Sequence, residues 1–509
     1  QTDGINSITE GYNYVYFATE NAGILRFQIY QNRFVEPITI VQGLSDNQIL
    51  AVHFDQSTRI LWVASEDFID YSYNTEGDWF HINLTEIGLH PGAFIRQIGS
   101  SENYIWLNAE NSFIKLDKIS GIVLGLFPFP DDDEIIWSSK RERYLEIPNT
   151  LKNYVIMDGW IINDNQFIDP FGKTVAPTTF YFGRNNEVYF GLEDGTILYG
   201  DIQMETFYPF SFGLNSTDIT AFTKNDKLWI VGRKNFDGEG ITKYYSNQNY
   251  FKHIDFENTI NLRSQPFYSV IETNKEVWFG GNSAISIYNK KEDYWREITE
   301  INGIPNGIIT SMVEDTSSIW VGTTRGLVKI SKTNKHNEKI EFGNLLNLLR
   351  INDLKIVRGN LWIATESYLL IYDQENNLLI DFKQFKNVEN IDKIKNIITG
   401  FSSLYQNDNS IYVSTPVGIF EYDIQDEYWT LAVEPSAYAG SRVNDLVIEN
   451  GYCFIGTNNG IWQINLADGN SQLYDYPFIG SVQDMYIQGD TLLIGSDNGL
   501  IKYLWKKNL

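Results

Sequence analysis

The sequence predicts an all-β fold, a β-propeller of about twelve four-stranded blades arranged as two rings. Three observations lead to this fold class. One phrase returns along the whole chain, each copy contains short runs that alternate apolar and polar residues, and the aromatic residues that anchor the copies recur at intervals of roughly 40 to 50 residues. Four short strands in a repeat of about 40 residues are typical of a propeller blade, and no helical repeat shows this alternation.

The repeated phrase is clearest in SIWVGTTRGLVKI at 318–330, and other copies read EVWFGGNSAISIY at 276–288 and YCFIGTNNGIWQI at 452–464. The runs are rich in Ile, Val, Trp and Tyr, which favour strands, and Asp, Asn and Gly separate them. An aromatic residue at a fixed place in each copy is expected to be buried between blades. These anchors are Tyr16, Trp62, Trp106, Tyr189, Trp229, Trp278, Trp320, Trp362, Tyr412 and Phe454.

Two glycine positions accompany the anchors. The first lies two residues after the anchor and is expected to permit close approach of the neighbouring blade or a bulge; it is occupied by Gly191, Gly280, Gly322 and Gly456. The second is expected to form a tight turn at positive φ, which only glycine adopts without strain; it is occupied by Gly195, Gly326, Gly418, Gly460 and Gly499.

The segment before the inner strand of a blade is also shared, as in VQGLSDNQILAVHFD at 41–55 and INGIPNGIITSMVED at 301–315. Together with the phrase above, it resembles the two-component-regulator propeller repeat, which occurs in ectodomains of bacterial sensor kinases and in related secreted propellers of the Bacteroidetes type. The resemblance covers nearly the whole chain. It implies an extracytoplasmic β-propeller that often senses a ligand. It implies no shared active site, so no catalytic residue is carried over.

Twelve blades exceed the four to eight of a typical ring, so two rings are expected. The favoured boundary lies near 258, in the polar stretch FENTINLRSQP, which gives one propeller at 1–258 and a second at 259–509. A division of five and seven blades near 210, or a split ring of early and late blades, is also compatible with the sequence. The fourth copy, at 134–172, is degenerate, and its inner strand is expected in EIIWSS. The last blade ends after its third strand.

The composition restricts the partners. The 509 residues include 39 Lys and Arg and 65 Asp and Glu, a net charge of −26. Nucleic acid and anionic membrane surfaces are not expected as partners, because phosphate binding needs clustered cations. The sequence has no apolar run of 18 residues, so no direct membrane insertion is expected. The single cysteine, Cys453, excludes an intrachain disulfide and is expected to be buried.

The expected location is extracytoplasmic: the periplasm, the outer-membrane surface or the medium. The chain begins with Gln1, and we interpret it as a product from which a signal peptide has been removed. A trimmed sequence would look the same.

Calcium is the one cofactor for which the sequence offers candidates, because carboxylate oxygens suit hard cations. Asp131 and Asp133 belong to the acidic stretch FPFPDDDEIIW at 127–137, and Asp237 and Glu239 belong to NFDGEG at 235–240. Neither stretch has the D-x-D-x-D-G spacing of a loop that wraps a cation. The alternatives are a solvated acidic linker and a hairpin extension.

Two loops are candidates for ligand contact, GLSDN at 43–47 and NGIPNG at 302–307, because loops from successive blades converge on one face of a propeller. The alternative is that their Asp, Asn, Gly and Pro only shape turns. The sequence has no G-x-S-x-G, P-loop, CxxC or HxxxH motif, so no catalytic residue is predicted and the chain is not expected to be an enzyme.

The predicted function is an extracytoplasmic binding propeller that recognises a glycan or a surface component, as a sensor would. A structural subunit of a cell-surface or secretion complex, with another protein as partner, is the alternative. A polysaccharide lyase or hydrolase is a third reading, and it would require acids and aromatic residues clustered in one groove. The ligand-binding residues cannot be named from the sequence.

Overall fold

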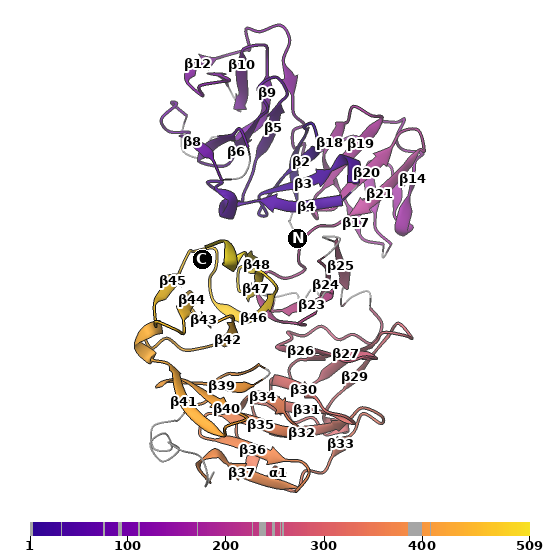
Figure 1. The fold of residues 1–509 in the computed structure, drawn as a ribbon. Helices are drawn as coiled ribbons and strands as arrows, with labels where there is room; N and C mark the ends of the chain where they lie inside the picture. The colour runs from indigo at the N-terminus through magenta and orange to yellow at the C-terminus, as the bar shows by residue number, and fades with distance from the viewer. Residues whose placement is uncertain are drawn as a thin grey trace. The chain divides into compact units, whose positions relative to one another are not determined.

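The computed structural model describes residues 4–31, 33–74, 77–89, 94–109, 112–170, 172–225, 227–233, 241–246, 250–254, 256, 259–384, 400–407 and 409–508. The chain forms two compact units. Unit 1 consists of Gln1–Gly213 with Tyr245–Lys252, and unit 2 consists of Leu214–Tyr244 with His253–Leu509. The all-β prediction is confirmed, and most of the sheets are four-stranded and antiparallel (Figure 1).

In the described part of unit 1, four sheets have the strand order of a propeller blade. Their inner strands follow one another in space as β9, β5, β1 and β18. The strands are β1 (Ile5–Glu10), β2 (Tyr14–Thr19), β3 (Ile24–Gln28), β4 (Arg33–Ile38), β5 (Ala51–Asp55), β6 (Ile60–Ala64), β7 (Phe68–Ser72), β8 (Trp79–Asn83), β9 (Ile95–Ser100), β10 (Tyr104–Ala109), β11 (Ser112–Asp117), β12 (Val123–Phe127), β18 (Pro177–Phe182), β19 (Glu187–Leu192), β20 (Ile197–Asp201) and β21 (Thr206–Phe210).

The fourth predicted repeat, at 134–172, is not a blade, and this part of the prediction was wrong. Its residues form β13 (Ile136–Trp137), which pairs with β9, and β14 (Val155–Ile156), which pairs in parallel with β21. They also form β15 (Ile161–Asn163) and β16 (Gln166–Ile168), to which β17 (Thr174–Val175) adds to complete a small sheet. The physical reason lies at Gly99 in β9. A Cβ there would lie 2.7 Å from the ring of Trp137, so the glycine leaves room for β13 to add to an existing sheet.

The chain after β13 runs along the inner strands of unit 1. Its backbone amides bond in succession to carbonyl oxygens of β9, β1 and β18, through Ser138 N to Ile98 O (3.0 Å), Ser139 N to Ile8 O (3.0 Å) and Glu142 N to Thr178 O (2.8 Å). Inner strands line the axis of a propeller, so this segment occupies the axial position of unit 1.

The described part of unit 2 contains seven successive sheets, six of four strands and a last one of three. In the first sheet, the end of β24 and the start of β25 fall in the segment Tyr245–Lys252, which belongs to unit 1. The strands are β22 (Ile219–Phe222), β23 (Lys227–Gly232), β24 (Ile241–Tyr245), β25 (Tyr250–Ile254), β26 (Ser269–Glu272), β27 (Glu276–Gly280), β28 (Ile285–Asn289), β29 (Tyr294–Ile298), β30 (Ile309–Glu314), β31 (Ser318–Thr323), β32 (Gly326–Ser331), β33 (Asn337–Glu338), β34 (Ile351–Val357), β35 (Asn360–Thr365), β36 (Leu369–Asp373), β37 (Leu378–Asp381), β38 (Leu404–Gln406), β39 (Ser410–Thr415), β40 (Gly418–Asp423), β41 (Tyr428–Val433), β42 (Asp445–Glu449), β43 (Tyr452–Thr457), β44 (Gly460–Asn465), β45 (Ser471–Tyr474), β46 (Val482–Gln488), β47 (Thr491–Ser496) and β48 (Gly499–Tyr503).

Short helices connect some of these strands. They are α1 (Gly343–Leu346), η1 (Ile29–Gln31), η2 (Ile40–Gln42), η3 (Met157–Gly159), η4 (Glu300–Asn302), η5 (Phe382–Gln384), η6 (Pro435–Tyr438) and η7 (Trp505–Asn508). Within the described residues, no helix is long and apolar enough to span a membrane.

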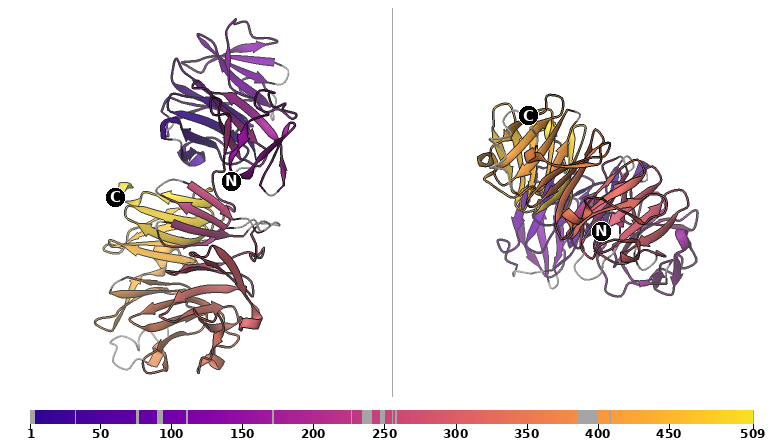
Figure 2. Two further views of the ribbon diagram at one scale, coloured as in Figure 1. Left: turned by 90° about the vertical axis from the view of Figure 1, so that its right-hand side faces the viewer. Right: turned by 90° about the horizontal axis from the view of Figure 1, so that it is seen from below.

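The blades of unit 2 close into a ring. Inner strands β22, β26, β30, β34, β38, β42 and β46 pack in this order, and β46 packs against β22. Figures 1 and 2 show the yellow C-terminal strands beside the magenta strands that begin the unit. The strand β22 is therefore needed to complete the second ring. The division between units falls near 213, which coincides with the alternative cut near 210 and not with the favoured cut near 258.

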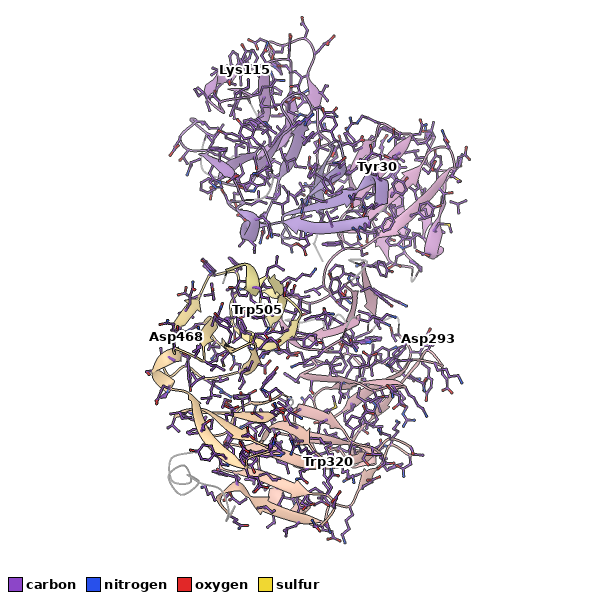
Figure 3. The ribbon with its side chains drawn as sticks, viewed as in Figure 1. Tyr30, Lys115, Asp293, Trp320, Asp468 and Trp505 are labelled. Carbon is purple, nitrogen blue, oxygen red and sulfur yellow. The ribbon has the colours of Figure 1, made fainter. Side chains whose placement is uncertain are left out.

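The anchors and glycines lie where the repeat predicts them. All ten anchor aromatics are buried, with exposed fractions of 5% or less, and Trp320 lies inside the sheets of unit 2 (Figure 3). A Cβ on Gly456 would lie 2.6 Å from Val482 on the next inner strand, and a Cβ on Gly322 would lie 2.7 Å from Ile351. Glycine at this position thus allows neighbouring blades to approach closely. The turn glycines have positive φ, between 80° and 132°.

Two consecutive residues at the start of the inner strands, or directly before it, link neighbouring blades by hydrogen bonds. At the first position an Asn or Thr side chain donates to a carbonyl oxygen of the next inner segment, as in Thr310 to Ile351 O (2.6 Å), Asn352 to Phe401 O (2.6 Å) and Asn444 to Val482 O (2.9 Å). At the second position a Ser or Asp side chain accepts from a backbone amide of the next blade, as in Ser311 from Leu354 N (3.2 Å), Asp353 from Leu404 N (2.9 Å) and Asp445 from Met485 N (2.8 Å).

Candidate functional site

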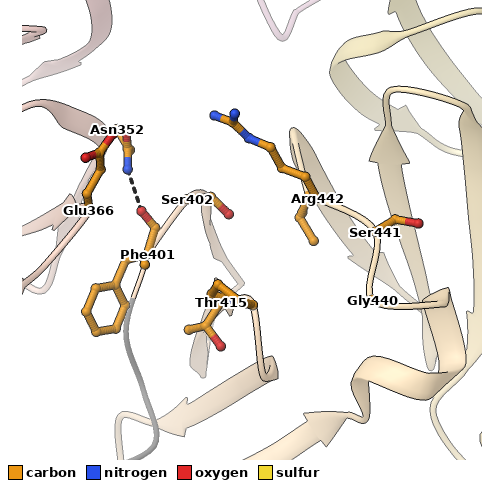
Figure 4. A pocket seen from close by; sticks show the side chains of 11 residues that line it. Asn352, Glu366, Phe401, Ser402, Thr415, Gly440, Ser441 and Arg442 are labelled. Carbon is orange, nitrogen blue, oxygen red and sulfur yellow. Dashed lines mark hydrogen bonds between the residues drawn. The ribbon is translucent and has the colours of Figure 1, made fainter.

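A cavity of about 370 Å³ opens between three blades of unit 2. This volume lies at the lower end of the range for small-molecule sites. Figure 4 shows its walls, which come from Asn352, Glu366, Gly400, Phe401, Ser402, Thr415, Pro416, Gly440, Ser441, Arg442 and Val443.

The walls come from the two kinds of loop that the repeat places on one face. One kind leads into an inner strand and includes 400–402 and 440–443, and the other follows a second strand and includes Glu366. The two kinds meet because the start of an inner strand pairs with the end of the second strand, as Ile351 pairs with Thr365. The cavity therefore lies on the face where we expected ligand contact, but neither 43–47 nor 302–307 contributes to it.

Several polar side chains of the cavity are occupied by bonds within the protein. Asn352 donates to Phe401 O at 2.6 Å and accepts from Arg350 Nε at 3.0 Å. The hydroxyl of Thr415 donates to Gly418 O at 2.8 Å, and that of Ser402 lies 2.8 Å from the hydroxyl of Ser414. The side chains of Asn352, Ser402 and Thr415 are thus held in place by hydrogen bonds within the protein, and they have little hydrogen-bonding capacity left for a ligand. We call these three side chains the polar floor of the cavity.

Three other polar side chains face the cavity and form no hydrogen bond or ion pair with the described residues: Glu366, Ser441 and Arg442. Glu366 and Arg442 are exposed. In Figure 4 the guanidinium of Arg442 extends across the opening toward the side where Asn352 and Glu366 lie. The cavity thus offers a cation and a carboxylate from different blades.

The backbone around these groups is fixed. The carbonyl of Glu366 accepts from Gly400 N at 2.9 Å, and the turn after β35 is held by the Thr365 hydroxyl, which accepts from Tyr368 N at 2.8 Å. Before Arg442 the chain turns at Ala439 and Gly440, both at positive φ. Val443, next to Arg442, is buried. Both charged side chains therefore project from anchored loops.

A second polar cluster lies on the inner strands of the same ring. Lys224 Nζ is 3.3 Å from Asp484 Oδ1, and Asp445 and Asp353 occupy equivalent places on their own strands. Burial lowers the pKa of Lys224, but Asp484, Asp445 and Asp353 outweigh it, so the net shift is upward. Burial raises the pKa of Asp445 to about 7, a shift that Lys224 opposes and Asp484 reinforces.

One of the two predicted calcium residues of unit 1, Asp131, contacts a lysine. Lys115 Nζ contacts Asp131 Oδ1 at 2.5 Å and Asp132 Oδ1 at 3.3 Å, and it lies 4.1 Å from the ring centre of Tyr104 and 4.9 Å from that of Trp106. Burial lowers the pKa of Lys115, but the hydrogen bonds that it donates to the carboxylates of Asp131 and Asp132 outweigh this, so the net shift of the pKa is upward. Two acids of this stretch therefore already neutralise a cation of the protein. Figure 3 labels Lys115.

Asp133 is exposed, and Asp237 and Glu239 lie outside the described residues. Among the residues that the structure describes, no group of three or more His, Cys, Asp or Glu side chains is arranged to hold a metal ion. Calcium binding at Asp131 and Asp133 stays a prediction.

The loop at 43–47 contains a serine that meets an aspartate and a histidine. Ser45 Oγ lies 2.7 Å from Asp70 Oδ1 and 2.9 Å from His81 Nδ1, and His81 Nδ1 lies 2.8 Å from the same Asp70 oxygen. In a hydrolytic triad the serine and the aspartate bond to opposite nitrogens of the imidazole. Here both lie at Nδ1, so the hydroxyl is held by the carboxylate and the cluster has no nucleophile–base relay.

The loop at 302–307 makes local bonds of the kind expected for a turn. Asn302 Oδ1 accepts from Thr299 N at 3.2 Å, and Asn306 Oδ1 accepts from the Ser283 hydroxyl at 2.9 Å. Turn formation accounts for these side chains.

The buried histidine of unit 1 is His53, whose exposed fraction is 2%. Its Nε2 lies 2.9 Å from the Ser100 hydroxyl. Burial lowers the pKa of His53 to about 4, and the Lys118 charge adds to this while Asp55 opposes it. The imidazole is therefore neutral at neutral pH.

No protein-family model matches the chain. It is 25% identical over 353 residues to "Histidine kinase P4" of Formosa agariphila, and the match covers 62% of this chain. The chain spans only 24% of the length of that relative.

Among solved structures, the chain is similar to the extracellular domain of the hybrid two-component system BT4673 of B. thetaiotaomicron, with 12% identity, a TM-score of 0.45, and 98% of this chain and 70% of that chain covered. It is also similar to PorZ, a surface component of the type-IX secretion system of Porphyromonas gingivalis, with 13% identity, a TM-score of 0.45, and coverages of 98% and 73%. The match to a histidine kinase agrees with the resemblance to the two-component-regulator propeller repeat, and the likenesses to solved structures concern the fold alone.

Proposed function

We propose that this chain is an extracytoplasmic binding propeller and that the cavity of unit 2 binds a small hydroxylated ligand, a glycan or part of a surface component. The observation that carries the proposal is the cavity itself. It joins the polar floor to three uncommitted polar side chains, Glu366, Ser441 and Arg442. A few placed polar groups in a concave site are the usual basis of small-molecule recognition.

The location outside the cytoplasm rests on the resemblance of the repeats and on the matched proteins, which include an extracellular domain and a surface component. The role of a sensor rests on the match to a histidine kinase. In that case the ligand would alter a signal that another part of a longer protein transmits.

Thermal unfolding of the purified chain against a panel of neutral and acidic monosaccharides and disaccharides tests the proposal. A ligand present at about 100 times its dissociation constant adds roughly 2.7 kcal/mol of apparent stability. We expect at least one sugar to raise the melting temperature of the wild-type chain, and the shift to be reduced in a Glu366→Gln, Arg442→Ala double variant. Absence of a shift with every sugar would overturn the proposal.

A structural subunit of a cell-surface or secretion complex is the second candidate, favoured by the likeness to PorZ. It predicts a stable complex with another protein in native extracts and no small-ligand response. A polysaccharide lyase or hydrolase would shorten a polysaccharide substrate, which a separate assay of the products released would measure.

A further inference from the structure

The proposed ligand carries hydroxyl groups, and the charged side chains of the cavity limit its chemical class further. The hydroxyls and amide of the floor are engaged within the protein, through Asn352, Ser402 and Thr415. Among the described residues that line the cavity, the groups that remain for a ligand are one guanidinium, one carboxylate and one hydroxyl. These belong to different blades, since Glu366 follows β35 while Ser441 and Arg442 precede β42.

We propose that the cavity recognises a sugar with a single oxyanion, which Arg442 binds while Glu366 accepts hydrogen bonds from the sugar hydroxyls. This inference rests on the proposed function and names the ligand class of that site. A planar guanidinium can donate two parallel hydrogen bonds to a carboxylate or a sulfate. The side chain of Glu366 is acceptor-only when ionised and so suits hydroxyl donors.

The charge balance favours one oxyanion over several. The cavity supplies one guanidinium against one carboxylate, and the whole chain carries 65 acidic against 39 basic residues. A polyanionic chain would be repelled by this surplus of negative charge. A ligand with one negative charge needs only the local contact with Arg442.

A carboxylate and a sulfate would meet Arg442 in the same way, so the test includes both. Calorimetric titration of the whole chain would compare glucuronate, glucose 6-sulfate, glucose and alanine. We expect glucuronate or glucose 6-sulfate to bind at least about tenfold more tightly than glucose, the change typical of one charge-assisted contact. The one of the two that binds more tightly identifies the oxyanion.

Variants then locate the contact. Arg442→Ala should reduce the affinity for the acidic sugar to that for glucose and leave the affinity for glucose unchanged, whereas Glu366→Gln should weaken both. Arg325→Ala serves as the control, because Arg325 is an exposed arginine on a loop of the same ring, after β31, and does not line the cavity. Melting temperatures without ligand show whether each variant is folded.

The outcomes separate this inference from the proposed function. Equal binding of glucose and its acidic derivatives, unaffected by Arg442→Ala, would overturn the inference and leave the binding propeller standing. Binding of alanine in preference to all sugars would also overturn it, because Glu366 would then pair with an ammonium group. Failure of every sugar to bind to the folded proteins would overturn both the inference about an acidic sugar and the proposed function.

Discussion

The carboxylate of Asp484 accepts a hydrogen bond from the backbone amide of Phe222 at 2.9 Å, and it thereby joins the last inner strand of unit 2 to the first. The other oxygen of Asp484 lies 3.3 Å from Lys224 Nζ. On the neighbouring second strand, a Cβ on Gly495 would lie 2.8 Å from Ile219. Hydrogen bonds, an ion pair and close packing therefore act together where the ring closes.

Substitution Asp484→Ala should lower the free energy of unfolding of unit 2 by about 1–3 kcal/mol, because the Phe222 amide loses its acceptor and Lys224 loses its partner. Asp484→Asn keeps an acceptor for the amide and should cost less. Urea unfolding measures both changes, and hydrogen exchange at β22 and β46 should accelerate in the Ala variant. Asp426→Ala, at an exposed position, is the control. Equal stability of the Asp484→Ala variant and the wild type would show that the closure of the ring between β46 and β22 does not depend on this side chain.

Asp445 should make the free energy of unfolding of unit 2 depend on pH. Its ordinary pKa is 3.8, and burial raises the folded-state pKa to about 7. Between these values the folded chain holds a proton that the unfolded chain has lost, so the free energy of unfolding falls as the pH rises from about 4 to about 7. The fall is at most about 1.4 kcal/mol per pH unit.

Asp445→Asn removes this titration, and the uncharged amide can still accept from Met485 N. The stability of the variant relative to the wild type should therefore increase from pH 5 to pH 8. Urea unfolding at the two pH values measures it, with Asp426→Asn as the control. A difference that is the same at both pH values would contradict the assignment.

His53 should make the free energy of unfolding of unit 1 depend on pH in the opposite direction. Burial lowers its pKa from 6.5 to about 4, so between these values the unfolded chain binds a proton that the folded chain lacks. The free energy of unfolding of unit 1 should fall as the pH drops from about 6.5 to about 4, by up to roughly 3 kcal/mol in total.

Thermal melts of wild type and His53→Gln across this pH range check the effect. The Gln side chain can bond to Ser100 without titrating, so the variant should lose less stability on acidification. His336→Gln is the control, because His336 is exposed. If both histidine variants lose as much stability as the wild type when the pH falls, His53 is not the group responsible for the loss.

Lys115 should decide whether the acidic stretch of unit 1 takes up calcium. Its ammonium group already contacts Asp131 and Asp132, so millimolar Ca²⁺ should stabilise the wild-type chain little. Lys115→Met frees both carboxylates and retains an apolar side chain near Tyr104 and Trp106. We expect Ca²⁺ to raise the melting temperature of this variant more than that of the wild type, and EDTA to reverse the rise.

The control for calcium is Lys152→Met, which removes a lysine paired with the exposed Asp164. A large Ca²⁺ response of the wild type itself would instead support direct binding by Asp131 and Asp133, as the sequence predicts.

The repeat made most of the fold predictable. Anchors such as Trp320 and glycines such as Gly456 are local consequences of a strand pattern, and both lie in the structure as expected. The division between the units depends instead on which inner strand closes the ring, a contact between β46 and β22 across more than 250 residues. The sequence around 134–172 was misread because Trp137 joins the sheet of β9, which only the packing at Gly99 reveals.

The sequence predicted the face of the propeller on which the cavity lies, but not the residues that line it. Arg442 and Glu366 are single charged residues in exposed loops, and no motif surrounds them. Glu366 occupies the loop position that is Thr324, Pro416 or Asn458 in other copies, and the same position is a glutamate in earlier copies, as at Glu20, Glu66 and Glu193. The repeat alone therefore does not single out Glu366.

The joint between β46 and β22 is made from the same parts as the joints between other blades. An Asp side chain accepts from the next backbone amide at Asp353, Asp445 and Asp484 alike, with distances of 2.8 to 2.9 Å. The ring therefore has no privileged starting point. A circular permutant that links the two ends of unit 2 and opens the chain between β37 and β38 would retain every one of these joints. The order of the blades in space and their order along the chain are therefore separable properties of this propeller.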